Sequence, residues 1–147
     1  MEKKPERWNY VNYMKTTPAF IIAGIIFYFS SLSHPLPPGS GEGTIPIDIT
    51  TLLHIAEYAA LSFFLTFGFN KKIKSQFIIL IGVLYAISDE IHQYFVPYRY
   101  FDVFDILLDT IGVLLGLVGF LITYKIAVSL ISKIKKNTSQ VNLDTLQ

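Results

Sequence analysis

The sequence predicts an all-α integral membrane protein, a four-helix transmembrane bundle with both termini cytoplasmic. Of its 147 residues, 52% are hydrophobic and only 16% are charged, which is more apolar than one small soluble core can accommodate. Four stretches approach the roughly 20 apolar residues that a helix needs to cross a bilayer. Apart from Arg99, basic residues flank only one end of each stretch, as they do at cytoplasmic ends.

The first stretch covers about residues 17–33 and is the shortest. A signal peptide is the alternative interpretation, because Ser31 and Ser33 resemble the small residues of a cleavage site. The long segment before it holds Glu2 and Glu6 as well as lysines, which is unusual for a signal peptide. Retention of this helix is therefore favoured, and both alternatives stay open.

The later stretches follow closely on one another. They cover about residues 50–69, 73–96 and 103–124. A tight lysine-rich turn separates the second from the third, and Pro97–Asp102 separates the third from the fourth. Residues 137–147 are polar, and we expect a disordered tail there. The sequence thus predicts a single membrane domain over residues 1–136.

Basic and acidic residues gather on opposite sides of the predicted membrane. Eleven of the twelve basic residues lie at the ends predicted to be cytoplasmic, and Arg99 alone lies at the other end. Eight of the eleven acids lie in the outer loops or the outer halves of the stretches. We therefore expect a multi-pass protein of the cell membrane, N-in and C-in. A net charge of +1 gives no basic surface for nucleic acid, and the absence of cysteine excludes disulfides and thiolate metal sites.

The outer acids and histidines recur at helical spacing, which places each set on one face of its helix. The sets are His54, Glu57 and Tyr58; Asp89, His92 and Gln93; and Asp102, Asp105 and Asp109. Gly112 and Gly116 continue the last set as a small-xxx-small pattern that lets another helix approach closely. Because an unpaired charge in hydrocarbon costs about 3 kcal/mol or more, we expect these side chains to face the interior of the bundle and to form a polar pocket open to the outer side. Structural hydrogen bonding between helices is the alternative.

Four motifs, in this order, resemble the VanZ-like family over roughly residues 20 to 120. They are Phe27–Ser31, His54–Leu61, Asp89–Arg99 and Asp105–Gly112. The resemblance implies a small bacterial four-helix membrane protein, related to one that raises tolerance to the antibiotic teicoplanin. Many members carry a lysine where Thr50 and Thr51 stand, and a glycine where Tyr98 stands. The first departure makes the expected pocket more acidic.

Two functions are compatible with this pocket. The first is binding of a glycopeptide antibiotic or a lipid-linked cell-wall precursor. The expected ligand-binding residues are His54, Glu57, Tyr58, Asp89, His92, Gln93, Arg99, Asp105 and Asp109. The second is a divalent-metal-dependent hydrolase or transferase acting on a lipid headgroup at the outer leaflet. Its metal ligands would come from His54, Glu57, Asp89, His92 and Asp105, and its catalytic candidates are Glu57, Asp89, His92 and Asp109.

The spacing matches no established zinc motif, so the sequence leaves open whether a reaction is catalysed. Proton sharing among Glu57, Asp89 and Asp109 is a third possibility, since they lie at one depth. No polar run continues into the inner halves of the helices, so the sequence gives little support for a path across the membrane.

Overall fold

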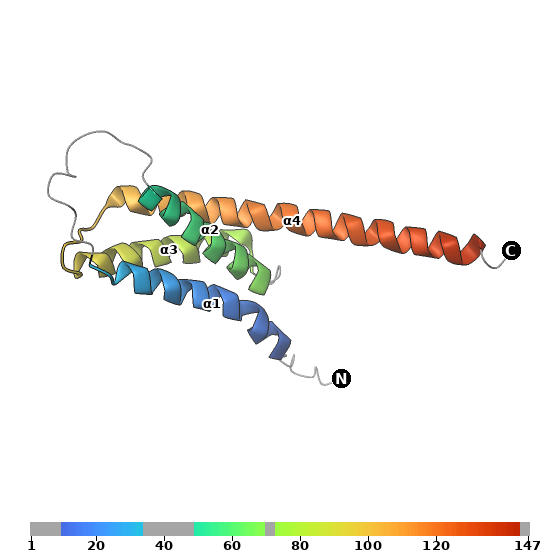
Figure 1. Cartoon of the computed structure of the whole chain (residues 1–147), viewed down its shortest axis with the longest axis horizontal. Coiled ribbons are helices and arrows are strands. Elements are labelled where there is room, and N and C mark those ends of the chain that lie inside the picture. Colours follow the sequence, from blue (N-terminus) through green and yellow to red (C-terminus); the bar gives the residue numbers. More distant parts are fainter. Residues whose placement is uncertain (1–9, 34–48, 70–72, 145–147) are drawn as a thin grey trace.

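The structure, a computed structural model, describes residues 10–33, 49–69 and 73–144. Within these ranges the chain forms four helices and no strand. They are α1 (Tyr10–Ser30), α2 (Ile49–Phe69), α3 (Ser75–Tyr94) and α4 (Val103–Asp144). Successive helices run in opposite directions, and the start of α1 and the end of α4 lie toward the same end of the molecule (Figure 1). The all-helical prediction is confirmed.

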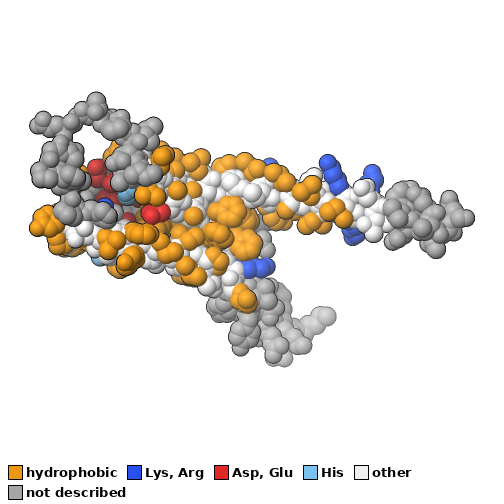
Figure 2. Space-filling view, in the orientation of Figure 1, with side chains coloured by type: hydrophobic (Ala, Val, Ile, Leu, Met, Phe, Trp, Pro, Cys, Tyr) orange, Lys and Arg blue, Asp and Glu red, His pale blue; other side chains and the backbone are white. Residues whose placement is uncertain are grey.

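Three helices of the described part are long and apolar enough to cross a membrane. The apolar segments are Thr51–Phe69, Ser75–Tyr94 and Val103–Ser139. The apolar part of α1, Met14–Ser30, is shorter. Many large hydrophobic side chains on all four helices face outward and are exposed, as lipid-facing side chains are, and they cover much of the face seen in Figure 2. Length, composition and this exposed apolar surface identify a membrane protein.

The core lies where α2 contacts the other three helices. From α2 it takes Tyr58, Leu61 and Leu65, which are buried. The other helices contribute Ala19, Ile26, Ile78, Ala86 and Val113. Since α1 supplies two of these buried residues, it packs as part of the bundle.

Glycines allow α2 and α4 to approach each other closely. A Cβ atom on Gly112 would lie 2.5 Å from the carbonyl oxygen of Ile55, and one on Gly116 would overlap the carbonyl oxygen of Ala59. Neither position can hold a side chain without separating the helices. The close approach expected from the Gly112–Gly116 spacing is therefore confirmed, and its partner is α2.

The last helix is longer than its apolar stretch. α4 has 42 residues, against 20 or 21 in each of the others, and ends at Asp144. The expected disordered tail over 137–147 is thus corrected to a helix as far as Asp144. No proline follows Pro97 and no glycine follows Gly119, so the sequence has no strong helix breaker there.

Candidate functional site

A polar pocket of about 420 Å³ opens at the end of the bundle where α1 and α3 finish and α2 and α4 begin. Such a volume is within the range of small-molecule sites. Acidic side chains gather at this end in Figure 2. The lining residues are Phe29, Ser30, Leu53, His54, Glu57, Asp89, Gln93, Tyr98, Arg99, Tyr100, Asp102 and Asp105. Every helix therefore contributes to the pocket or borders it.

His54 lies between two aspartates of α4. Its Nδ1 atom is 3.0 Å from Oδ1 of Asp109, and its Nε2 atom is 3.9 Å from Oδ2 of Asp105. Asp109 is fully buried, whereas Asp105 lines the pocket. Asp105 and Asp109 are one helical turn apart, so they lie on the same face of α4. The polar faces predicted for α2 and α4 therefore face one another.

Asp89 anchors α3 to α1. Its Oδ2 atom accepts a hydrogen bond of 2.8 Å from the Ser30 hydroxyl and one of 3.0 Å from Nε2 of Gln93. All three side chains are buried. The other oxygen, Oδ1, is also buried. Ser30 is a site residue that the helical spacings did not single out, although it belongs to the Phe27–Ser31 motif.

Glu90 holds the connection between α3 and α4. It is fully buried, and its Oε2 atom accepts a 2.9 Å hydrogen bond from the backbone N–H of Asp102. Its Oε1 atom accepts one of 3.1 Å from Gln93. The Asp102 carboxylate in turn accepts from the N–H of Phe104 at 2.7 Å, which caps the start of α4. Glu90 thus positions the loop residues of the pocket without lining it.

Among the described residues, Arg99 is the only lysine or arginine that lines the pocket. Its Nη2 atom donates to the carbonyl oxygen of Phe29 at the end of α1, at 3.3 Å. The preceding residue, Tyr98, has a φ of 66°, in the left-handed region that glycine adopts readily and a bulky residue does not. A glycine at this position would therefore suit the backbone better than the tyrosine does.

Four buried polar atoms at or beside the pocket have no hydrogen-bond partner among the described residues. They are Tyr58 Oη, Asp89 Oδ1, Arg99 Nε and Asp109 Oδ2. A buried polar group without a partner is costly, so such atoms in native proteins are usually satisfied by water or ligand. A polar ligand or an ordered water that formed hydrogen bonds with these atoms would therefore stabilise the site most.

The predicted site residues are thus mostly gathered together. His54, Glu57, Asp89, Gln93, Arg99 and Asp105 line the pocket. Asp109 and Tyr58 lie buried behind this lining. His92 does not line it: the ring stacks on Phe27 with centroids 4.4 Å apart, and Nε2 is 3.0 Å from the hydroxyl of Ser31. His34, Glu42 and Asp48 lie outside the described residues.

The five residues expected as metal ligands are not brought together as one donor set. Among the described residues, no three His, Asp or Glu side chains converge to hold a metal ion. The nitrogens of His54 face aspartates of α4, and His92 faces α1. The geometry therefore lends the metal-dependent alternative no support.

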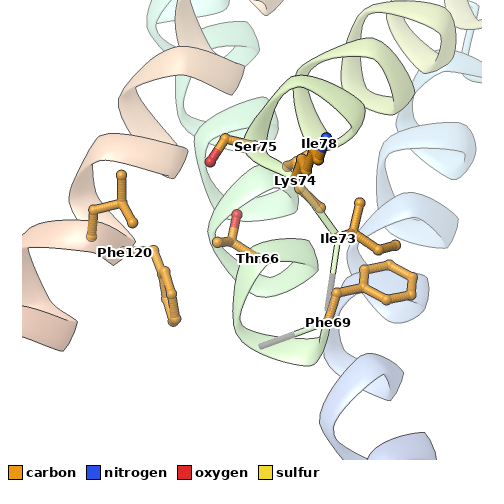
Figure 3. A pocket seen from close by; sticks show the side chains of 8 residues that line it. Thr66, Phe69, Ile73, Lys74, Ser75, Ile78 and Phe120 are labelled. Atoms are coloured by element: carbon orange, nitrogen blue, oxygen red, sulfur yellow. The ribbon is translucent and has the colours of Figure 1, made fainter. Parts of the chain in front are cut away.

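A second pocket, of about 170 Å³, lies at the other end of the bundle (Figure 3). It is formed where α2 ends and α3 begins, beside the middle of α4. It is lined by Thr66, Phe69, Ile73, Lys74, Ser75, Ile78, Phe120 and Leu121. No acidic residue or histidine is among them, so this pocket has none of the chemistry that distinguishes the first.

A family model described as VanZ/LLP1 matches residues 4–124, which include all four helices up to Tyr124 and every residue that lines the polar pocket. No curated protein and no solved structure matches the chain.

Proposed function

The chain belongs to the VanZ/LLP1 family, and from this premise we propose that its polar pocket is an outward-facing binding site for an amphiphile with a positively charged group. The observation that carries the proposal is the composition of the pocket lining. In the part of the lining that the structure describes, four carboxylates, those of Glu57, Asp89, Asp102 and Asp105, stand against a single arginine. A cationic group would relieve the excess negative charge.

The apolar part of the ligand would lie against the aromatic walls. Phe29, Tyr98 and Tyr100 line the same pocket as the acids, with Leu53 beside them. Aromatic side chains of this kind gather where a membrane meets water. A ligand with an amine and an acyl chain matches both parts of the lining. Teicoplanin-type lipoglycopeptides have this chemistry, and the family resemblance points to them, so we propose that binding lowers the free antibiotic at the cell envelope.

The orientation required is N-in and C-in, with all four helices crossing the membrane. The packing of Ala19 and Ile26 in the core supports α1 as the fourth membrane helix. The distribution of basic residues supports an outer pocket. Because the chain has no cysteine, single-cysteine variants test this without background. In whole cells a membrane-impermeant maleimide should label Phe95→Cys at the pocket end and spare Ser132→Cys on α4; the reverse pattern would contradict the orientation.

Binding is tested with teicoplanin as the probe and purified protein in lipid nanodiscs. We expect Asp105→Asn and Glu57→Gln each to weaken binding about tenfold, the equivalent of about 1.4 kcal/mol. Asp144→Asn, at the far end of α4, removes one acid outside the pocket and should leave binding unchanged.

Two results would contradict the proposal. One is teicoplanin binding that is equal in all three variants. The other is a preference for a pyrophosphate-linked wall precursor that depends on Arg99 and not on the acids, tested with Arg99→Gln. That result would assign the pocket to an anionic headgroup instead.

A further inference from the structure

The far half of α4 extends beyond the rest of the bundle (Figure 1). We call residues 125–139 the α4 extension. Every side chain of the α4 extension is exposed, whereas Phe120 and Leu117 one or two turns earlier are buried. Its length is about 21 Å at 1.5 Å per residue. Nothing in the pocket or its supports involves this segment, so it requires an explanation of its own.

The α4 extension has an apolar face. Ile126, Leu130 and Ile134 follow one another at intervals of four residues, and Ala127 and Ile131 lie beside them. Ile131 and Ile134 are each 65% exposed. A stripe of this kind is costly to leave in water, because large aliphatic side chains gain free energy when they leave water for an apolar environment.

The opposite face is polar and basic. Lys125, Ser129, Ser132 and Lys136 are spaced at i, i+4, i+7 and i+11, so they share one side of the helix. Lys133 and Lys135 border the same side. The sequence has no acidic residue between Asp109 and Asp144, so the α4 extension carries four positive charges and no negative one. Lysines are visible on the α4 extension in Figure 2.

A position where α4 can bend lies just before the α4 extension. The Thr123 hydroxyl donates to the carbonyl oxygens of Gly119 and Phe120, at 3.0 and 2.9 Å. Hydroxyl bonds of this kind loosen the backbone ladder and commonly bend helices. A glycine within the same turn adds freedom. The α4 extension can therefore change direction relative to the bundle while remaining helical.

We propose that the α4 extension lies along the surface of an anionic phospholipid leaflet at the bundle end opposite the polar pocket. Its isoleucines and leucine enter the headgroup region and its lysines face the lipid phosphates and water. An amphipathic helix with a basic polar face is the sequence type that binds such surfaces. A second copy of the helix fits less well, because four lysines on each copy would repel those of a parallel neighbour.

Spin labels on the two faces test the proposal in the full chain. Ile134→Cys places a label on the apolar face, and Ser132→Cys is the matched control on the polar face; both sites are exposed. Each variant is reconstituted in vesicles of phosphatidylcholine with added phosphatidylglycerol, and in vesicles of phosphatidylcholine alone. Accessibility to oxygen and to a water-soluble nickel complex is then measured for each label.

In anionic vesicles we expect the label at 134 to be reached by oxygen and shielded from nickel, and the label at 132 to be reached by nickel. The difference should shrink in phosphatidylcholine alone, and also when Lys133, Lys135 and Lys136 are changed together to glutamine. Equal nickel accessibility of both labels in anionic vesicles would overturn the proposal in favour of a free helix. A strong dipolar coupling between labels at 134, the same in both lipids, would overturn it in favour of pairing between copies.

Discussion

The Nδ1 atom of His54 lies 3.0 Å from Oδ1 of Asp109, and this contact joins α2 to α4 at the base of the polar pocket. It depends on the helix packing below it. Gly112, one turn after Asp109, lets the backbone of α2 approach at Ile55, one residue after His54. The polar pair and the glycine contact are therefore two parts of one interface.

Removing His54 should cost more stability than neutralising Asp109. His54→Ala leaves a fully buried carboxylate without its described partner, and breaking a buried pair in this way typically costs about 3–5 kcal/mol. Asp109→Asn leaves a neutral amide, for which we expect roughly 1–3 kcal/mol. The double variant should be more stable than the sum of the two losses predicts. Unfolding in detergent micelles measures all three, and strictly additive losses would contradict a direct interaction.

Glycine at 116 should be required for α2 and α4 to pack. In Gly116→Ala the new methyl group would overlap the carbonyl oxygen of Ala59, so we expect a loss of roughly 1–3 kcal/mol from overpacking. Gly24→Ala is the matched control, because a Cβ at that position would have no neighbour within 4 Å apart from the adjoining backbone of α1. Thermal unfolding of the two variants in the same detergent separates packing from helix propensity. A similar midpoint in both would show that the helices can separate without cost.

Glu90 should control the mobility of the connection between α3 and α4. Glu90→Ala removes the acceptor of the Asp102 N–H, so we expect faster hydrogen exchange at the amides of residues 102–105. Glu90→Gln keeps an oxygen at the same distance along the side chain and should exchange more slowly than the alanine variant. Exchange measured by mass spectrometry on the detergent-solubilised protein tests this. Equal protection in the wild type and both variants would rule out the positioning role.

Helical periodicity was sufficient to predict the helices and much of the site. Spacings of three, four and seven residues place polar groups on one face of a helix whatever the surroundings, and the structure then brings the polar faces of α2 and α4 together. The close approach at Gly116 could be predicted for the same reason, because only a small residue permits it.

Other features could not be predicted from single-helix patterns. Ser30 is one small residue at the end of α1, and only the fold shows that its hydroxyl meets Asp89 across the bundle. His92 shares the face of Asp89 in sequence, yet it packs on Phe27 because α1 lies beside it. The continuation of α4 through a polar segment depended on the absence of helix breakers rather than on apolar periodicity.

Tyr98 should carry backbone strain that a glycine relieves. At a φ of 66°, a residue with a Cβ atom costs about 1–2 kcal/mol more than glycine does. Tyr98→Ala and Tyr98→Gly both remove the ring from the pocket wall, but only the glycine variant also relieves the backbone. We therefore expect Tyr98→Gly to unfold at a higher temperature than Tyr98→Ala, by the equivalent of about 1 kcal/mol, with the same loss of teicoplanin binding in both. A higher midpoint for the alanine variant would mean that residue 98 is not held in this conformation, and that the pocket rim differs from the one described.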